Sequence, residues 1–515
     1  MALAIAGLVA LLLWAIWSAA AGQPLASGAQ LDVWHLLRMT TIQAALSTVL
    51  SLVVGVALAW ALNRLHFPGR ELLVALFASA IVTPGLLVAF GLLEVWGRSG
   101  WVSQALRALV GVAPDIPLFG LGGILAAHLI LDGAFAARIV LARLDAITPQ
   151  RLKTGQSLGL GPLARFRLID WPALRGTLPG LAAVIFLLAF TSFPVVLLLG
   201  GGPANQTLEV AIYSAVRLDF DLGAAVTLAL VQIAVCAVII LGASAFAPVP
   251  VTVATSRMQS WRDPIVARFF QWLVLILATL GFGLPLLAVL VGGAGPAIAS
   301  LIQNPAIWSA AATSLGVALA SALLALALAL VVCMARGATG MAWLRIGLGL
   351  PAYVYLAVPA MVLALGFFLL VRGLGIAPTN AAAPVVVLAN ALLALPFAVA
   401  TLGPPLEAIA KTRGRLIRSL GLSGWRQFRA IEWPLLGREI GIVLALGFCF
   451  SLGDLGVISL FGTQDFATLP LLMVRALGAY RSADAAGIAA FMLALTLVAF
   501  VALPPLVQRL AHARA

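Results

Sequence analysis

Two stretches of this sequence, SLGLGPLARFRLIDWPAL at residues 157–174 and SLGLSGWRQFRAIEWPLL at residues 419–436, are copies of each other. They align without a gap at an offset of 262 residues, and ten of the eighteen aligned positions are identical. Leucine-rich helices often resemble one another by accident, but these stretches are polar and contain Trp, Pro, Gly and Phe. Self-similarity at a fixed spacing indicates duplicated structural units, so we infer an internal repeat.

A second correspondence lies earlier in each half of the chain. The stretch TPGLLVAFGLLEV (83–95) resembles VPAMVLALGFFLL (358–370), which aligns Gly91 with Gly366. The offset here is 275 residues, so a shorter loop is expected after this point in the second half. Together the two correspondences predict that a whole architecture is duplicated.

The composition identifies the class of protein. The chain has 515 residues, of which 63% are apolar and 9% are charged, whereas soluble globular proteins carry about 25% charged residues. A protein of this size with so few charged residues cannot cover a water-facing surface. Most of its surface must therefore face lipid. The net charge of +13 would suggest nucleic-acid binding in a soluble protein. Here the basic residues lie in short loops between apolar runs, so we expect no nucleic-acid partner.

A transmembrane helix needs about 20 consecutive apolar residues. We predict an all-α polytopic membrane protein with about twelve such helices in two parallel six-helix repeats, residues 1–265 and 266–515. The predicted spans are residues 2–21, 40–62, 71–94, 118–141, 177–199, 222–246, 269–292, 309–334, 346–371, 384–403, 439–461 and 485–507.

The distribution of charge predicts the orientation of the chain. With a cytoplasmic N-terminus, 23 Lys and Arg residues lie on the cytoplasmic side and 7 on the other, as the positive-inside rule requires. Both termini are therefore expected in the cytoplasm, together with two segments that we call the first polar segment (142–176) and the second polar segment (404–438). The first span is expected to be retained, because no basic residue precedes Arg38 to form the start of a signal peptide.

Each polar segment is predicted to hold a short basic helix, at residues 145–158 or 407–420, that leads to a glycine able to end it. Apolar anchors and arginines follow, and a Trp-Pro pair marks the return to the bilayer. The candidate contact residues are Gly159, Arg165, Phe166, Ile169, Trp171 and Pro172 in the first polar segment, and Gly421, Arg426, Phe428, Ile431, Trp433 and Pro434 in the second.

Two partners could use these segments. A basic amphipathic stretch could lie on anionic lipid headgroups. Lipid binding needs charge and apolar area, but it does not need a fixed register of Gly, Phe and Trp-Pro. The duplicated identities therefore favour a docking surface for a two-fold protein partner.

At these residues the chain resembles the permease subunits of bacterial binding-protein-dependent ABC importers. Their signature is a Gly, nine spaced residues and Ile-x-Leu-Pro, and residues 159–172 and 421–434 fit this spacing with Trp in place of Leu. The Glu-Ala-Ala element that precedes the Gly in that family is absent, and Lys-Thr-Gly (153–155) and Arg-Leu-Ile (415–417) stand there instead.

Two such signatures in one chain resemble the ferric-ion and thiamine permeases. The resemblance implies a type I ABC importer permease fold in the bacterial inner membrane, with a dimer of ATP-binding subunits docked on the loop helices. It also implies a periplasmic solute-binding protein and transport of thiamine or thiamine pyrophosphate, with ferric ion as the alternative. The stretches that look closest to the thiamine permeases are SFPVVLLLGGGPANQTLEVAIY (192–213), SWRDP (260–264), SLGDLGVISLFGTQDFATLP (451–470) and GAYRSADAA (478–486).

The chain carries no sequence signature of its own energy source. A phosphate-binding loop G-x-x-x-x-G-K-[ST] is missing, because neither Lys153 nor Lys411 follows a glycine. ATP and Mg²⁺ are therefore expected on the partner subunit, and no cofactor, metal or catalytic residue is expected on this chain. The three cysteines have no neighbours at metal-ligand spacing.

Two other classes of protein were weighed against this prediction. A gradient-driven secondary transporter places ionisable residues within its spans, where Glu94, His128, Asp132 and Asp454 are candidates. For His128 and Asp132 an interhelical hydrogen bond is the simpler interpretation. The sequence offers no Ser/His/Asp set, metal cluster or paired carboxylates that would indicate a membrane enzyme.

Four residues are candidates for the substrate pathway. Asp454 and Ser451 lie where glycines can loosen the eleventh span, and a carboxylate there could meet a cationic solute, cap a helix break or pair with an arginine. Pro84 and Pro359 break corresponding spans of the two halves, which points to a central pathway or to simple packing kinks. The stretch GGGPANQ (200–206) is a candidate contact for the delivery protein or a flexible turn.

Overall fold

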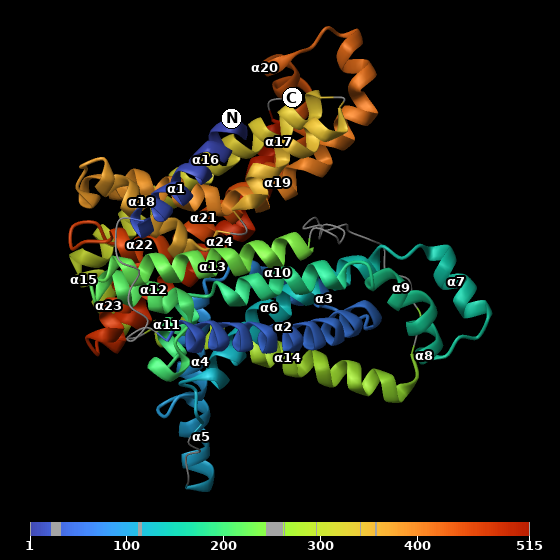
Figure 1. The fold of residues 1–515 in the computed structure, drawn as a ribbon. Coiled ribbons are helices and arrows are strands. Elements are labelled where there is room, and N and C mark those ends of the chain that lie inside the picture. The colour runs from blue at the N-terminus through green and yellow to red at the C-terminus, as the bar shows by residue number, and fades with distance from the viewer. Residues whose placement is uncertain are drawn as a thin grey trace. The chain divides into compact units, whose positions relative to one another are not determined.

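A computed structural model describes residues 2–21, 32–111, 116–243, 261, 263–294, 296–339, 341–355 and 358–513. Figure 1 shows the path of the chain, and its described part consists of helices and loops without any strand. Eight helices are long and apolar enough to cross a membrane, and two bent pairs raise this number to ten if each pair is one span. The all-α polytopic membrane fold is therefore confirmed, while the number of twelve spans stays a prediction.

The chain forms two compact units, each assembled from separate stretches of sequence. Unit 1 contains Met1–Asp32, Ala211–Ile233 and Gly292–Ala515, and unit 2 contains Val33–Val210 and Ala234–Val291. These units describe packing, whereas the predicted repeats at 1–265 and 266–515 describe duplication of sequence. The repeat boundary stays a prediction.

In unit 2, α2 packs along α6 and α10, and α4 packs on α6 and α11. The helices of unit 2 are α2 (Val33–Arg64), α3 (Arg70–Ala78), η1 (Ser79–Ile81), α4 (Gly85–Trp96), α5 (Trp101–Val110), α6 (Leu121–Asp145), α7 (Pro149–Ser157), α8 (Pro162–Arg165), η2 (Phe166–Asp170), α9 (Trp171–Leu174), α10 (Leu178–Phe190), α11 (Pro194–Leu199), η3 (Pro203–Asn205) and, except for its last residue, α14 (Ile265–Gly292). Both units contribute to α12 (Leu208–Arg217) and α13 (Leu222–Ala243).

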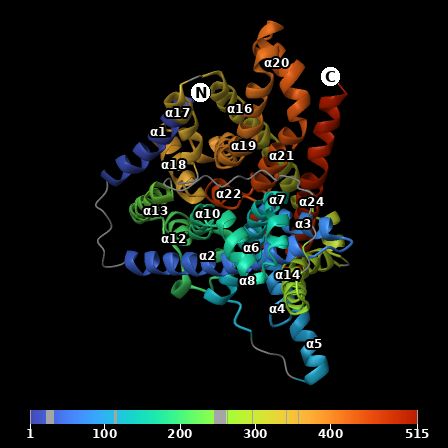
Figure 2. The ribbon, with the colours of Figure 1, turned by 90° about the vertical axis from the view of Figure 1, so that its right-hand side faces the viewer.

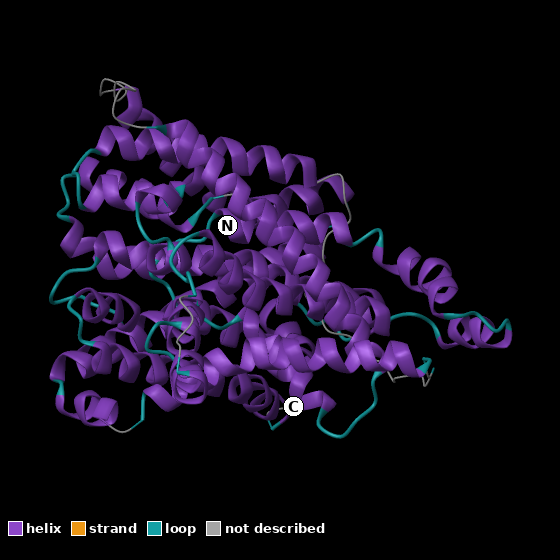
Figure 3. Cartoon of the chain, turned by 90° about the horizontal axis from the view of Figure 1, so that it is seen from below, coloured by secondary structure: helices purple, strands orange, loops and turns teal. Residues whose placement is uncertain are grey.

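In unit 1, α16 packs on α19 and α21, and α21 packs on α24. Figure 2 shows α1 beside α17 and α18, with which it is in contact. The helices of unit 1 are α1 (Ala2–Ala21), α15 (Pro296–Gln303), α16 (Pro305–Ala338), α17 (Ala342–Val354), α18 (Ala360–Gly373), α19 (Pro378–Ser419), α20 (Gly424–Gln427), η4 (Phe428–Glu432), α21 (Trp433–Leu452), α22 (Gly456–Phe461), α23 (Leu469–Gly478) and α24 (Ser482–His512). Figure 3 colours these helices and the loops that join them.

Small residues bring the long helices together. A Cβ added to Gly55 of α2 would lie 2.5 Å from the Cβ of Ala136 on α6. In unit 1, a Cβ on Gly441 of α21 would lie 2.6 Å from the Cα of Pro504 on α24. Helices in lipid gain no hydrophobic free energy by meeting, so close van der Waals contact between small residues has to hold them.

The first helix of each predicted repeat packs in the unit that holds most of the other repeat. A Cβ on Gly91 of α4 would overlap the carbonyl oxygen of Pro285 on α14. Its aligned residue, Gly366 of α18, faces α1, where a Cβ would lie 3.3 Å from the Cβ of Leu12. The duplicated glycine therefore marks a duplicated packing site.

Prolines interrupt two of the predicted spans at corresponding positions. Residues 70–81 and 85–110 are bent by 115° relative to each other, so the predicted span 71–94 is not one continuous helix. Pro84 precedes α4 with ψ 132° and Pro359 precedes α18 with ψ 151°, and in both cases the helix starts at the next residue. A proline has no N–H to continue a preceding helix, but its fixed φ suits a helix start.

Two further predicted spans are interrupted without a duplicated proline. The predicted span 177–199 is divided between α10, which ends at Phe190, and α11, which begins at Pro194. The predicted span 439–461 is divided between α21 and α22. Both breaks lie in aligned parts of the two halves, so the interruption belongs to the duplicated architecture.

The contact at Gly91 leads to a stability prediction. We expect Gly91→Ala to destabilise the protein by about 1–3 kcal/mol, because the new methyl group has to displace the backbone of α14. Gly281→Ala on α14 is the control, since its Cβ would meet no atom of the described chain within 4 Å. Thermal unfolding in detergent measures both variants. Equal unfolding midpoints for the two would contradict the predicted contact.

Candidate functional site

The two polar segments begin differently. In the first, α6 ends at Asp145 and α7 starts at Pro149, because the residue before a proline disfavours the helical conformation. In the second, Lys411 stands at the position of Pro149, and α19 continues without a break to Ser419. The prediction of a separate short helix at 407–420 is therefore wrong, since this stretch is the end of one 42-residue helix.

The same glycine turn ends both helices. Gly159 has φ 64° and Gly421 has φ 63°, a left-handed conformation that favours glycine. The N–H of Leu160 donates to the carbonyl of Gly155 (3.1 Å), and the N–H of Leu422 donates to that of Ile417 (3.1 Å), which is the Schellman pattern. A Cβ at either glycine would meet no atom of the described chain within 4 Å. The prediction that these glycines end helices is confirmed.

Each polar segment then contains a π-helix that sequence reasoning missed. The π-helices η2 and η4 cover aligned residues and lead directly into Trp171-Pro172 and Trp433-Pro434. A proline ring in a regular α-helix clashes with the carbonyl four residues earlier. A wider π-turn before the proline relieves this clash and lets the helix run on, so the Trp-Pro pair is the signal that could have predicted it.

The two segments expose apolar side chains at matching positions. Leu163 is 62% exposed and its aligned residue Trp425 is 72% exposed. Phe166 and Trp171 are also exposed, and their rings lie 6.2 Å apart. We call this set the apolar row, which consists of Leu158, Leu163, Phe166 and Trp171 in the first polar segment and Leu420 and Trp425 in the second.

The other predicted contact residues are placed differently. Arg426 is exposed, and Pro172, Trp433 and Pro434 are partly exposed. Arg165 and Ile169 are buried in the first segment, as are Phe428 and Ile431 in the second. Phe428 lies in an aromatic cluster, 5.3 Å from Trp425 and 6.1 Å from Trp433.

A buried ionic network holds the first polar segment. Arg64 at the end of α2 donates to Asp170 (2.5 Å), and its Nε lies 3.7 Å from the carboxylate of Asp263. The Nη1 of Arg165 lies 3.7 Å from Oδ1 of Asp263, and Gln271 of α14 donates to Oδ2, the oxygen near Arg64 (2.7 Å). The four charged side chains are 4–5% exposed. Buried charges are stable only when they are paired in this way.

Trp261 completes this network. The guanidinium of Arg165 lies 4.0 Å from the centre of the Trp261 ring. On another side of the ring, a Cβ on Gly155 of α7 would lie 2.9 Å from Trp261 and 2.7 Å from Ile169. The ring of Trp261 therefore contacts both α7 and α8. Sequence reasoning noted SWRDP (260–264) as a stretch of resemblance and gave it no role.

A polar cluster lies among the long helices of unit 1. The side-chain amide of Asn390 on α19 donates to Ser451 of α21 (2.9 Å), and Ser451 bonds Ser321 of α16 (3.2 Å). Beyond the end of α21, the carboxylate of Asp454 accepts from the N–H groups of Val457 and Ile458 at 3.2 Å each. Asp454 thus caps α22, which is one of the roles predicted for it.

One polar atom of this cluster lacks a partner. The side-chain oxygen of Asn390 has no hydrogen bond within the described residues, although Asn390 is 3% exposed. Buried acceptors are normally satisfied, so an unpaired one marks a place for a water or a ligand.

Unit 2 repeats part of this arrangement. Ser47 of α2 bonds the Nδ1 of His128 on α6 (2.9 Å), and His128 is the residue aligned with Asn390. Thr40 accepts from the N–H of Leu208 (3.0 Å), just as Ser314 accepts from the N–H of Leu469 (2.8 Å) in unit 1. The duplicated sequence therefore carries duplicated hydrogen bonds. The contact of His128 agrees with the interhelical role predicted for it.

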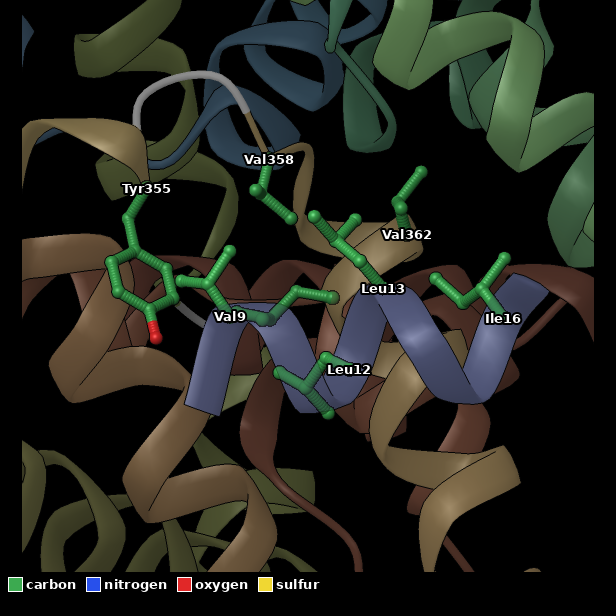
Figure 4. A pocket seen from close by; sticks show the side chains of 8 residues that line it. Val9, Leu12, Leu13, Ile16, Tyr355, Val358 and Val362 are labelled. Atoms are coloured by element: carbon green, nitrogen blue, oxygen red, sulfur yellow. The ribbon is translucent and has the colours of Figure 1, made fainter. Parts of the chain in front are cut away.

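The 200–206 stretch, an apolar cavity beside α1 and the possible metal ligands are the remaining candidates for a site. In the 200–206 stretch, residues 201–204 are exposed and the ring of His35 contacts the carbonyl of Ala204 (3.2 Å). The N–H of Gly120 donates to Leu199, just before the stretch (2.6 Å). Figure 4 shows an apolar cavity between α1 and residues 355–363, which offers no charged group to a solute. Within the described residues, no group of three His, Cys, Asp or Glu side chains is arranged to hold a metal ion.

No family model matches the sequence. The chain is 36% identical over 488 residues to the thiamine transport system permease protein of Salmonella typhimurium, covering 94% of this chain and 90% of that protein. The protein of the same name in Brucella melitensis is 36% identical over 486 residues, covering 93% and 89%. That of Haemophilus influenzae is 35% identical over 477 residues, covering 90% and 87%.

The open surface at Gly421 leads to a prediction about docking. We expect Gly421→Asp to abolish binding of the partner protein while the chain stays folded in the membrane, because the added Cβ would meet no atom of the described chain within 4 Å. Gly375→Asp is the matched control, since Gly375 also follows a helix with φ 72° and meets no described atom within 4 Å. Each change should cost about 1–2 kcal/mol through its left-handed backbone. Co-purification of the partner measures the effect, and normal binding by Gly421→Asp would count against docking at this glycine.

Proposed function

Because the chain belongs to the family of thiamine transport system permease proteins, we propose that it carries thiamine or thiamine pyrophosphate across the inner membrane of a bacterial cell. The chain is a transmembrane permease subunit of an importer and not an enzyme. The observation that carries the proposal is the extent of the match, which covers more than nine tenths of the chain in the first relatives and includes both polar segments.

The polar segments are the proposed docking sites for a dimer of ATP-binding subunits, which would hold ATP and Mg²⁺. A two-fold partner needs two equivalent surfaces, and the apolar row supplies aligned exposed pairs, Leu158 with Leu420 and Leu163 with Trp425. Exposed aromatic side chains next to arginines, such as Trp171 and Trp425, are typical of the energetic centre of a protein interface. Both polar segments and both termini would then lie in the cytoplasm.

The buried members of the predicted contact set have a positioning role in this proposal. Arg165 and Ile169 hold the shape of the first polar segment, and Ile431 does so in the second. The exposed Phe166, Trp171 and Arg426 would touch the partner directly. Gly159 and Gly421 end the helices and leave room for the partner to approach.

A periplasmic solute-binding protein is the proposed donor of the solute. The 200–206 stretch is the candidate contact, because residues 201–204 are exposed while α2 holds the backbone at Ala204 and the loop before α6 holds the preceding Leu199. A held loop can present a surface without a large entropic cost on binding.

The substrate pathway is proposed to pass the polar cluster at the break of α21. Thiamine carries a fixed positive charge and an amino group. The carboxylate of Asp454 offers a negative charge, and the side-chain oxygen of Asn390 offers an acceptor that no described residue occupies. Ser451 orients Asn390 by accepting from its amide. The restarts after Pro84 and Pro359 supply the matching helix breaks that line such pathways.

The substrate is tested in cells. We expect a deletion strain to lose uptake of dilute labelled thiamine and to keep uptake of ferric ion, with the plasmid-borne gene restoring the loss. Vesicles that contain this chain alone should accumulate no thiamine, because the energy comes from the ATP-binding partner. Loss of iron uptake with normal thiamine uptake would contradict thiamine as the substrate. Accumulation of thiamine in vesicles that hold this chain alone would contradict ATP hydrolysis by a partner as the energy source.

The role of Asp454 leads to a second prediction. Asp454→Asn keeps an oxygen that can cap α22 but removes the charge, so we expect transport of thiamine to fall about tenfold, which corresponds to about 1.4 kcal/mol. Asp221→Asn is the control, because Asp221 also caps a helix by accepting from Ala224 (2.9 Å). Uptake into vesicles with the complete importer measures both. Equal uptake by the two variants would remove Asp454 from the pathway.

A further inference from the structure

The stretch that precedes α14 contacts the first polar segment at several points. Asp263 lies between the guanidinium groups of Arg64 and Arg165, and Trp261 lies against Arg165 and Gly155. Gln271 fixes Asp263 from within α14. We call Trp261 and Asp263 the linker clamp. It joins α7 and α8 of the polar segment region to α2 and α14.

The second polar segment is built differently at the aligned positions. Gln427 stands where the first segment has Arg165, and it donates to Glu432 (2.6 Å), the residue aligned with Asp170. Ile417 stands where the first segment has Gly155 and is 7% exposed, so an isoleucine side chain occupies the position that admits Trp261 in the first segment. Gln427 and Glu432 therefore bond within their own segment, although Glu407 near its start pairs with Arg336 of α16 (3.5 Å). In the first segment, Arg165 pairs with Asp263 of the linker and Asp170 pairs with Arg64 of α2.

We propose that Trp261 and Asp263 are positioning residues that lock the first polar segment to α2 and α14, so that the two polar segments transmit motion of the docked partner unequally. The proposal rests on the proposed function of the polar segments as docking sites. The first segment moves as one body with two long helices. The second moves with α19, of which it is the direct continuation.

The linker clamp is rigid because breaking its contacts costs free energy. If the Asp263 carboxylate moved away, the buried guanidinium of Arg165 would lose its ion pair, whereas Arg64 would keep Asp170. The ring of Trp261 fills the gap beside a glycine, so a displaced tryptophan would leave a void there. Forces applied at the apolar row therefore reach α2 and α14 with little internal deformation.

The first measurement tests rigidity in the chain itself. Spin labels at Lys153→Cys on α7 and Phe269→Cys on α14 report the distance across the clamp, and the native cysteines are buried and should stay unlabelled. We expect a narrow distance distribution in the parent, and at least a twofold broader one in Trp261→Ala and Asp263→Asn. Trp261→Phe keeps a ring over Arg165 and should stay narrow. Asp484→Asn, which removes a carboxylate from the separate pair Arg481–Asp484, is the control.

The second measurement tests coupling in the complete importer. Thiamine transported per ATP hydrolysed should fall about tenfold in Trp261→Ala and Asp263→Asn, while the ATP-binding partner still co-purifies. Unchanged distance distributions in both variants would overturn the clamp. Broader distributions with a normal transport ratio, or loss of the partner, would overturn its role in coupling. A parent importer that hydrolyses ATP without moving thiamine would refute the proposed function instead, and the distance measurement would still decide the clamp.

Discussion

Helices that meet inside a bilayer gain nothing by excluding water, and every backbone polar group there must find a partner within the protein. This constraint explains why glycines lie where the long helices touch. Gly55, Gly91 and Gly441 each sit so close to a neighbouring helix that a methyl group would collide with it. Surface contact replaces the hydrophobic effect as the source of packing energy, and the positions of small residues therefore decide which helices pair.

The same constraint limits the polar groups within the bundle. Some bond to the backbone of their own helix, as Thr48 and Thr496 do, and others bond across helices, as Ser47 does with His128 and Asn390 with Ser451. Such bonds fix the rotation of each helix about its axis, which packing of small residues alone leaves open. Some buried polar atoms have no hydrogen-bond partner among the described residues, and the side-chain oxygen of Asn390 is one of them. A polar solute can then be recognised where the protein has left an acceptor unused.

The two polar segments share a backbone turn but differ in part of their contacts. Both contain a glycine turn and a π-helix before a Trp-Pro pair. Asp170 is paired with an arginine from another helix, whereas the aligned Glu432 accepts from a glutamine of its own segment. Duplication thus preserved the shape that a two-fold partner would meet. The support behind that shape diverged between the halves.

The sequence by itself determined the membrane class, the duplication, the helix ends at Gly159 and Gly421, and the helix starts after Pro84 and Pro359. These features follow from composition and from backbone preferences that act within a few residues. The tertiary structure decided that Arg165 and Ile169 are buried, and that Asp263 joins the first polar segment to α2 and α14. Burial and ion pairing depend on which distant residues fold back onto a segment, and two copies of one motif look alike until those neighbours are in place.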